Sequence, residues 1–406
     1  MQNPKPNRFQ WITSLCLLCL LVLTAPVIVV AQDTNITDGC VTDYDTAVDY
    51  FPDKAEFEYA TGVEVEYFNN YKVVTVLQPW PGADTSYQYV LVQCGTPAPA
   101  VTDFPNAQVI EVPIERIISM STTFLPPLDS LGVADTLVGV DETDFVSTAS
   151  VRERIVSGEV VEVGGGADVN VELTLDLEPD VVMTDSFGSP EYDEHPKLLE
   201  AGLSVVMNGD WVETEPLGWA EWVKFMALFY NREAQATTLF DDVEAHYNEL
   251  VALAADVSER PTVMTGIQYD GIWYTSGGDS YFAQILEDAG ADYLWADDST
   301  MGSLSLDLES VLERAADADY WVNANQFWFS LDDIAAEDER YTDFAPYQNQ
   351  TIYANNARLN EFGGNDYYES GAAHPDQILA DLISIFHPDL LPDHELLFYQ
   401  QLQPAA

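Results

Sequence analysis

The sequence predicts an α/β protein made of two similar lobes with mainly parallel sheets, joined by a long α-helix and preceded by a β-rich N-terminal extension. From residue 117 onward, short apolar strands alternate with amphipathic helices, which is typical of parallel sheets covered on both faces. Residues 170–183 and 306–322 repeat one unit, in which an acidic residue opens a short helix and a strand follows an Asp. Residues 219–260 contain neither Gly nor Pro, which indicates the joining helix.

Residues 1–31 have the composition of an export signal peptide. Lys5 and Arg8 precede an uncharged run over residues 11–30, and Val29-Val30-Ala31 is a small-residue cleavage site. The run of roughly 20 residues could also hold the protein in a membrane as an uncleaved anchor, whereas its cysteines lack the usual context of lipid attachment. We therefore expect an extracytoplasmic protein, either periplasmic or at the cell surface.

Residues 32–110 predict a small antiparallel sheet that forms the N-terminal extension. Polar and apolar residues alternate over 63–67, 71–76 and 87–92, and turn residues separate these strands at 69–70 and 79–82.

Cys40 and Cys94 are the only cysteines left after removal of residues 1–31. In an exported chain two cysteines most simply form one disulfide. Closing a loop of about 55 residues in this way could stabilise the fold by roughly 4 kcal/mol. We expect a structural clasp on the extension, because no Cys-x-x-Cys motif accompanies it.

Residues 111–212 predict the N-terminal lobe. Its expected strands lie at 117–120, 138–140, 181–183 and 204–207. Ser121, Thr122 and Thr123 follow the first strand and cap a helix that runs to Leu131 and stops at Gly132.

Residues 213–259 predict the linking helices, a shorter one over about 216–230 and a long one from about Arg232. Apolar residues recur there at spacings of three and four. Residues 260–406 form the C-terminal lobe, with strands at 262–266, 272–275 and near 320 and 352. Its helices are expected at 281–289, from Glu309, and over 375–386.

The chain carries 69 acidic and 14 basic residues, a net charge of −55. Such a surface repels nucleic acid and anionic lipids, and it disfavours a strongly anionic ligand unless a cationic pocket is present. We interpret the charge itself as an adaptation to a saline medium or as a means of solubility. The charge therefore constrains the partner without identifying it.

No motif for catalysis, for phosphate binding or for a compact metal site is present. The sequence has no Gly-x-Ser-x-Gly, His-Glu-x-x-His, Gly-Lys-Ser/Thr or Gly-x-Gly-x-x-Gly, and its five histidines are scattered. We expect no enzyme activity, no catalytic residue, no bound metal and no cofactor. Aromatic residues are dense instead, and those at strand ends and in loops suit a bulky, partly apolar ligand.

The order of the motifs from about Glu115 to Leu402 resembles that of the class III periplasmic substrate-binding proteins, which have two Rossmann-like lobes. The motifs that carry the resemblance are Arg116-Ile117-Ile118-Ser119, Asn170-Val171-Glu172 with Pro179-Asp180-Val181-Val182, Pro216-Leu217-Gly218, Gly277-Gly278-Asp279-Ser280-Tyr281, Gly364-Asn365-Asp366-Tyr367-Tyr368 and His387-Pro388. These proteins serve ABC importers for ferric siderophores, haem and cobalamin. Residues 32–110 depart from the pattern.

The resemblance implies a monomer that captures a bulky chelate between its lobes and delivers it to the permease subunits of an ABC importer. One exposed Glu on each lobe would dock on permease arginines, and Glu172 and Glu309 occupy the matching helix starts. A simpler alternative is that both merely favour a helix N-terminus.

We expect a ferric siderophore of hydroxamate or mixed carboxylate type, because few cations are available for a catecholate. Iron would then be part of the bound chelate only. Cobalamin, haem and a non-transport surface binding module are the alternatives. The expected ligand-binding residues are Thr122, Trp211, Trp273, Trp328, Arg358 and Tyr368. Arg358 is expected to supply the main positive charge, since it follows a strand in a loop that should open at the cleft; a surface salt bridge is its alternative role.

Overall fold

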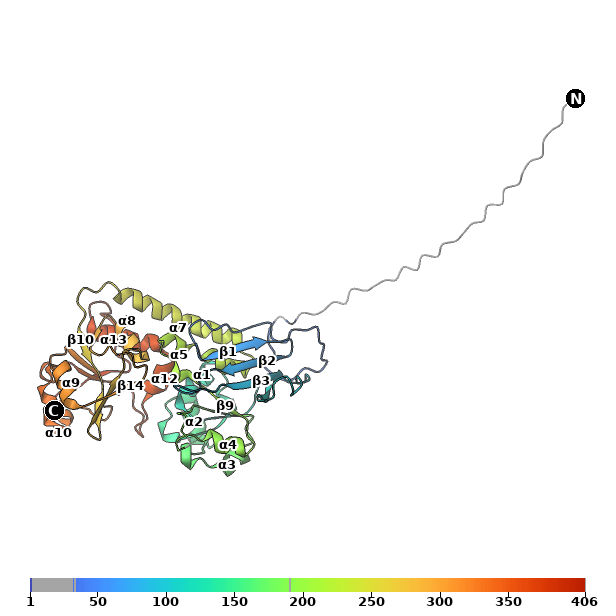
Figure 1. The fold of residues 1–406 in the computed structure, drawn as a ribbon, viewed down its shortest axis with the longest axis horizontal. Coiled ribbons are helices and arrows are strands. Elements are labelled where there is room, and N and C mark those ends of the chain that lie inside the picture. The colour runs from blue at the N-terminus through green and yellow to red at the C-terminus, as the bar shows by residue number, and fades with distance from the viewer. Residues whose placement is uncertain (2–31, 33, 190, 406) are drawn as a thin grey trace.

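The structure is a computed structural model that describes residue 1, residue 32, residues 34–189 and residues 191–405. The expected signal peptide lies outside the described residues. Two α/β lobes lie beside each other, and helix α7 (Glu233–Ala254) runs across both of them (Figure 1). Among the described residues, no helix is both long and apolar enough to cross a membrane. The expected fold class is confirmed.

The N-terminal extension forms a four-stranded sheet in the order β1-β2-β3-β4. Its strands are β1 (Val63–Tyr67), β2 (Tyr71–Val76), β3 (Tyr87–Gln93) and β4 (Gln108–Val112). The three expected strands pair antiparallel, and β4, which was not expected, adds to β3 in parallel. Tyr89 and Ile110 of this sheet share one buried core with Val206 and Phe229 of the lobe and its linking helices. The extension is thus an integral part of the N-terminal half.

The expected disulfide between Cys40 and Cys94 is present, with their Cα atoms 4.7 Å apart. The Val41 amide donates to the carbonyl oxygen of Cys94 at 2.9 Å. Gly95 has φ +80°, and a Cβ there would lie 2.1 Å from the Val41 carbonyl oxygen. Only glycine fits this close approach.

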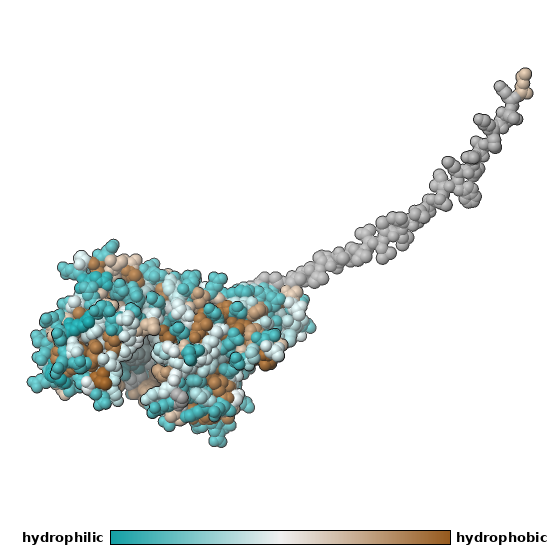
Figure 2. Space-filling view, in the orientation of Figure 1, coloured by the Kyte–Doolittle hydropathy of each residue, from teal (hydrophilic) through white to brown (hydrophobic). Residues whose placement is uncertain are grey.

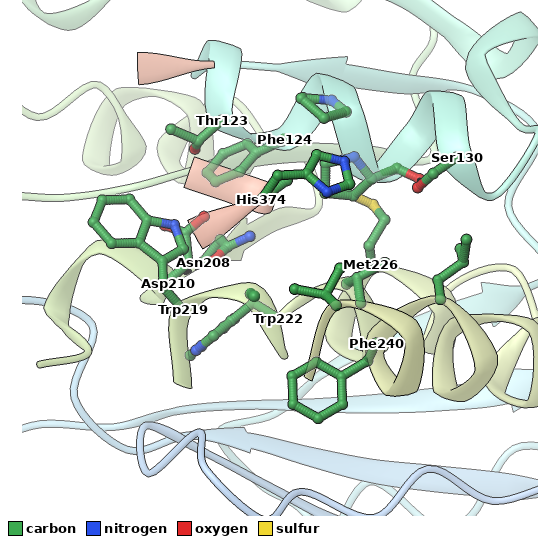
Figure 3. Close-up of a pocket in the computed structure, with 17 residues that line it drawn as sticks. Thr123, Phe124, Ser130, Asn208, Asp210, Trp219, Trp222, Met226, Phe240 and His374 are labelled. Atoms are coloured by element: carbon green, nitrogen blue, oxygen red, sulfur yellow. Dashed lines mark hydrogen bonds between the residues drawn. The ribbon is translucent and has the colours of Figure 1, made fainter. Parts of the chain in front are cut away.

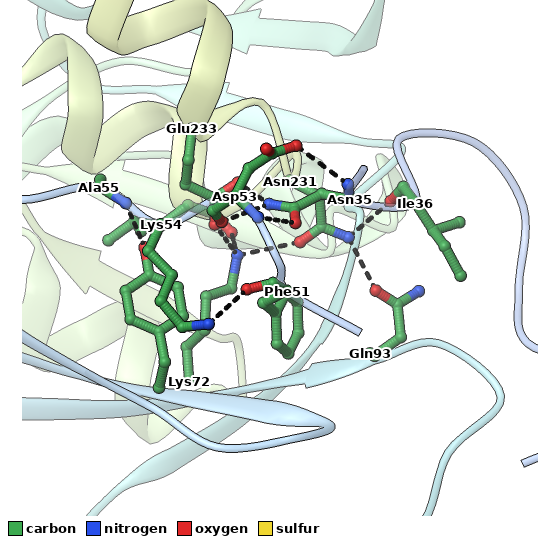
Figure 4. A network of polar contacts seen from close by, with 12 residues as sticks. Asn35, Ile36, Phe51, Asp53, Lys54, Ala55, Lys72, Gln93, Asn231 and Glu233 are labelled. Carbon is green, nitrogen blue, oxygen red and sulfur yellow. Dashed lines mark hydrogen bonds and ion pairs between the residues drawn. The ribbon is translucent and has the colours of Figure 1, made fainter. Parts of the chain in front are cut away.

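A second anchor of the extension is a buried ion pair between Lys72 of β2 and Glu233 at the start of α7. Their Nζ and Oε1 atoms are 2.7 Å apart, and both side chains are fully buried (Figure 4). Lys72 Nζ also donates to Asn231 Oδ1 at 2.9 Å, and Asn35 Nδ2 donates to Glu233 Oε2 at 2.8 Å. Hydrogen bonds therefore compensate both buried charges.

The N-terminal lobe contains an all-parallel sheet in the order β7-β6-β5-β8-β9. Its strands are β5 (Ile117–Ser119), β6 (Leu137–Val140), β7 (Val161–Glu162), β8 (Val181–Thr184) and β9 (Val205–Met207). Its helices are α1 (Leu125–Ser130), α2 (Ala149–Ser157), α3 (Val171–Asp176) and α4 (His195–Glu200). The central strands are almost entirely buried, as expected for a sheet covered on both faces.

The linking region contains α5 (Pro216–Ala220), α6 (Val223–Leu228) and the long α7. The expected shorter helix over 216–230 is therefore divided in two. Helix α7 begins one residue after the expected Arg232, and Phe240, Tyr247 and Leu250 point from it into the core of the C-terminal lobe.

The C-terminal lobe has a five-stranded sheet and a separate three-stranded sheet. The first has the order β13-β10-β15-β16-β17, from β10 (Thr262–Met264), β13 (Asp292–Tyr293), β15 (Tyr320–Ala324), β16 (Ile352–Ala354) and β17 (Gln400–Gln401). Only β17 pairs antiparallel. The second is antiparallel and contains β11 (Ile267–Tyr269), β12 (Ile272–Ser276) and β14 (Ser303–Leu306). The helices are α8 (Tyr281–Asp288), α9 (Leu308–Ala315), α10 (Leu331–Glu337), α11 (Ala345–Asn349), α12 (Ser370–Ala373) and α13 (Pro375–Phe386).

Candidate functional site

The candidate site is a groove between the two lobes, visible as a deep hollow in the molecular surface (Figure 2). Residues that follow parallel strands line it. Asp141 follows β6, Asp185 follows β8, and Gln326 lies two residues after β15 of the other lobe. Loops at the carboxyl ends of parallel strands are where open α/β sheets usually bind ligands. The topology of both lobes thus directs these loops into one groove.

One part of the groove is a hollow of about 420 Å³ that brings together two of the expected residues. Thr122 comes from the loop after β5, and Tyr368, which is 53% exposed, comes from the C-terminal lobe. Phe187 and Tyr192, both exposed, add aromatic surface from the loop after β8. The volume lies within the range of small-molecule sites.

Carboxylates dominate the polar part of this hollow, where Asp141, Asp185 and Glu194 all line it. Burial raises the pKa of Asp141 to about 6 and, with repulsion from neighbouring carboxylates, that of Asp185 to about 7. Glu194 accepts hydrogen bonds from the Gly166 amide at 3.0 Å and from the Thr184 hydroxyl. The hollow therefore offers acceptors to a ligand and becomes more negative between pH 5 and pH 8.

A second hollow of about 580 Å³ adjoins the first. Trp211 lines it from the N-terminal lobe, and Tyr274 and Met301 line it from the C-terminal lobe. The rings of Trp211 and Phe187, which line different hollows, are 5.4 Å apart, so the two hollows are neighbours. Among the described residues that line the two hollows, none is Lys, Arg or His. The groove is aromatic and acidic.

Asn323 lines the second hollow from a strained backbone position. It has φ +48° and lies where the pairing of β15 with β16 shifts register. Its side chain accepts from the Tyr399 hydroxyl at 2.6 Å and donates to the Tyr367 hydroxyl at 3.3 Å. The irregularity thus places Asn323 at the edge of the hollow while its amide is held by two buried tyrosines.

Two side chains of the C-terminal lobe tie the lobes together beside the groove. Glu369 is fully buried, and its carboxylate accepts from the amides of Ser147 at 2.6 Å and Thr148 at 2.7 Å, just before α2. Asn360 donates from Nδ2 to the carbonyl oxygens of Asp144 at 2.9 Å and Val146 at 3.0 Å. Together with α7, these contacts hold the width of the groove.

A smaller cavity of about 60 Å³ lies among α1, α6 and α7 (Figure 3). Met226 and Phe240 line it together with Trp222 and the buried Asp210. Burial raises the pKa of Asp210 to about 7. The volume of this cavity is far below that of a site for a bulky ligand, so the cavity is not the candidate site.

Two of the expected wall residues lie elsewhere, and these predictions are corrected. Trp273 is 0% exposed, and its ring packs 5.4 Å from Trp321 in the core of the C-terminal lobe. Trp328 also packs against Trp321, with 5.4 Å between their ring centroids, and its Nε1 donates to Glu337 at 2.6 Å. Side chains alternate along β12, so Tyr274 faces outward in place of Trp273.

The expected role of Arg358 is also corrected. Its loop does reach the lobe junction through Asn360, but the Arg358 guanidinium pairs with Asp366 at 2.6 Å. The side chain of Arg358 is 49% exposed and that of Asp366 is 7% exposed. Arg358 is not among the residues that line the hollows, and its charge is neutralised within its own loop. The alternative role, a salt bridge, is what the structure shows.

Glu172 and Glu309 occupy matching positions on their two helices. Each is exposed and is the second residue of its helix, α3 or α9. Asn170 caps α3 by accepting from the Leu173 amide at 3.1 Å, and Asp307 caps α9 by accepting from the Ser310 amide at 2.9 Å. Each helix start is thus capped by another residue, and the carboxylate of each Glu is left exposed.

Comparison with known proteins identifies the class. The family model described as periplasmic binding protein matches residues 117–358, more than half of the chain, and the chain belongs to this family. It is 26% identical to one uncharacterized lipoprotein of Methanocaldococcus jannaschii over 307 residues, covering 72% of this chain and 70% of that protein. It is also 26% identical to a second uncharacterized lipoprotein of the same organism over 381 residues, covering 86% of this chain and 90% of that protein. The second alignment covers 86% of this chain, which is more than the two lobes contain, and it therefore includes part of the extension.

Among solved structures, the fold is similar to that of a protein from Staphylococcus epidermidis described as a possible iron-binding, periplasmic solute-binding protein. The TM-score is 0.53 at 19% identity, covering 68% of this chain and 99% of that one. The resemblance to class III periplasmic binding proteins is thereby confirmed. The chain is therefore a periplasmic binding protein by family, and it shares the fold of that solved structure.

Proposed function

We propose that the protein captures a ferric siderophore of the hydroxamate type in the groove and delivers it to an ABC importer permease. The observation that carries this proposal is the lining of the two neighbouring hollows, which combines aromatic rings with carboxylates and contains no basic residue among those described. A ferric trihydroxamate is bulky, partly apolar and free of net negative charge, so it meets no repulsion there. Iron as the cargo agrees with the description of the Staphylococcus epidermidis protein as possibly iron-binding.

The same lining disfavours negatively charged siderophores and haem. Catecholate and mixed carboxylate siderophores carry negative charge with iron bound, and haem carries two carboxylates. Each would lie against Asp141, Asp185 and Glu194 without a compensating cation in the lining. Of the two siderophore types expected from the sequence, the groove thus favours the hydroxamate.

Cobalamin is the second candidate, and one observation favours it. Its peripheral amides are hydrogen-bond donors, and the groove offers the carboxylate acceptors Asp141 and Asp185 together with the side chains of Gln326 and Asn365. Unlike haem, it brings no carboxylates into the groove.

Calorimetric titration of the purified protein at pH 8 tests the proposal. The probes are ferrichrome (neutral), ferrioxamine B (monocationic), a ferric catecholate (trianionic), haem and cyanocobalamin. We expect the two hydroxamates to bind at least tenfold more tightly than the catecholate and haem, about 1.4 kcal/mol or more. Binding of cyanocobalamin alone would replace the ligand class, and binding of none of these chelates would refute the proposal.

Repeating the titration at pH 5 separates charge from shape. Asp141 and Asp185, with pKa values of about 6 and about 7, are mostly protonated at pH 5 and ionised at pH 8. The affinity for ferrioxamine B should therefore rise roughly tenfold from pH 5 to pH 8, because two nearby anions then attract its ammonium group. Ferrichrome, which has no such charge, should change less than threefold and serves as the control. An equal pH response of both probes would show that these carboxylates do not face the ligand.

A further inference from the structure

We propose that the loop between β2 and β3 of the N-terminal extension, residues 77–86, is a third wall of the ligand groove and limits which chelates fit. This inference rests on the proposed function. Gln78, Pro81 and Gly82 of this loop line the second hollow, together with Trp211 of the N-terminal lobe and Tyr274 of the C-terminal lobe. All three loop residues are exposed, so their surfaces are available to an occupant of the groove.

The loop is fitted into the N-terminal lobe at its centre. The Trp80 ring stacks on His195 with 6.2 Å between ring centroids. Gly188, with φ +73°, lies so close that a Cβ there would be 2.6 Å from Trp80 Nε1. A Cβ on Gly209 would be 2.9 Å from the Gln78 carbonyl oxygen. The loop therefore packs on the N-terminal lobe at two glycines, Gly188 after β8 and Gly209 after β9, where a larger side chain would collide with it.

Two buried glutamates fix the extension beside the groove. Glu213, which itself lines the second hollow, accepts from the amides of Thr61 at 2.9 Å and Gly62 at 2.8 Å. Glu221 accepts from the amides of Tyr59 at 2.8 Å and Ala60 at 2.7 Å. These charge-assisted hydrogen bonds join the extension to the linking helices at positions adjacent to β1. The loop is thus a fixed wall and not a lid that swings.

A fixed wall of this kind sets the length of the second hollow. A chelate whose periphery reaches past the Trp211 and Phe187 rings would meet Gln78 and Pro81, and we expect both ferrichrome and ferrioxamine B to reach that far. The Gln78 amide can donate to and accept from such a periphery. The extension would then select chelates by the size and hydrogen-bonding groups of their outer parts.

Two matched tryptophan substitutions test this inference. Gln78→Trp places bulk in the second hollow, and Thr85→Trp places the same bulk at an exposed position of the same loop that does not line the hollow. The probe is whichever of ferrichrome and ferrioxamine B binds the wild-type protein more tightly. We expect Gln78→Trp to weaken its binding at least tenfold and Thr85→Trp to change it less than twofold. Because both positions are exposed, both variants should melt within a few degrees of the wild type.

The outcomes are separable from those of the proposed function. Equal affinity of Gln78→Trp, Thr85→Trp and the wild-type protein would overturn the third wall while leaving chelate capture intact. An equal loss in both variants would also overturn it, because the effect would then come from the loop as a whole. Failure of the wild-type protein to bind any chelate would refute the proposed function itself.

Discussion

Replacing Lys72 with methionine should destabilise the protein by about 3–5 kcal/mol, because it leaves the buried carboxylate of Glu233 without its counter-charge. The pair is fully buried and lies between the extension and α7 (Figure 4). Burial lowers the pKa of Lys72, and the Glu233 charge opposes that shift. Urea unfolding followed by circular dichroism measures the loss as a lower midpoint at unchanged slope.

Two further variants make the Lys72 prediction specific. Lys54→Met removes an ion pair with Asp49 in the same extension whose side chains are 41% and 43% exposed, and it should cost less than about 1 kcal/mol. The double variant Lys72→Met/Glu233→Leu should be more stable than Lys72→Met alone, since no unpaired charge remains. If Lys72→Met lowered the free energy of unfolding as little as Lys54→Met does, the buried pair would not hold the extension in place.

Transport should fall at least tenfold when Glu172 and Glu309 are both replaced with alanine, while ligand affinity stays unchanged. Both residues are exposed, at matching positions of helices that other residues cap. Removing charges that pair across an interface weakens association and slows encounter. The measurement is uptake of the radiolabelled ferric chelate by vesicles containing the cognate permease, with chelate affinity determined separately by calorimetry.

The controls for docking lie on the same two helices. Asp176→Ala at the end of α3 and Glu313→Ala in α9 remove equally exposed acidic side chains from the same elements. Their double variant should transport at near wild-type rates. If it lost as much transport as the Glu172/Glu309 variant, general surface charge would explain the effect. Reduced chelate affinity with normal transport at saturating chelate would exclude docking as the role of the two glutamates.

The architecture could be predicted from the sequence because its signals are local. The apolar runs after residue 117, the stretch without Gly or Pro before α7, and the alternation over 63–76 and 87–92 each report on one element, and the structure has elements there. Strand β4 was missed because it pairs in parallel across a long connection after β3. Its pairing is set by tertiary contacts and not by a local pattern.

The groove was harder to predict, because side-chain direction depends on register and packing. Trp273 and Tyr274 are neighbours on β12, and a shift of one residue exchanges the buried and the exposed ring. Arg358 follows its strand as expected, but Asp366 neutralises it eight residues later. The rule that would have found Asp141 and Asp185 is available in sequence: Asp141 directly follows the predicted strand 138–140, and Asp185 lies two residues after the predicted strand 181–183.

The most direct test of the account is an anomalous difference map, recorded at the iron edge, from crystals of the protein with ferrichrome or ferrioxamine B. The account predicts one iron peak between the lobes, in the groove bounded by Thr122, Tyr368 and Trp211, with the ligand periphery in contact with Gln78. An iron peak outside this groove, or full occupancy of the chelate on another surface, would contradict it.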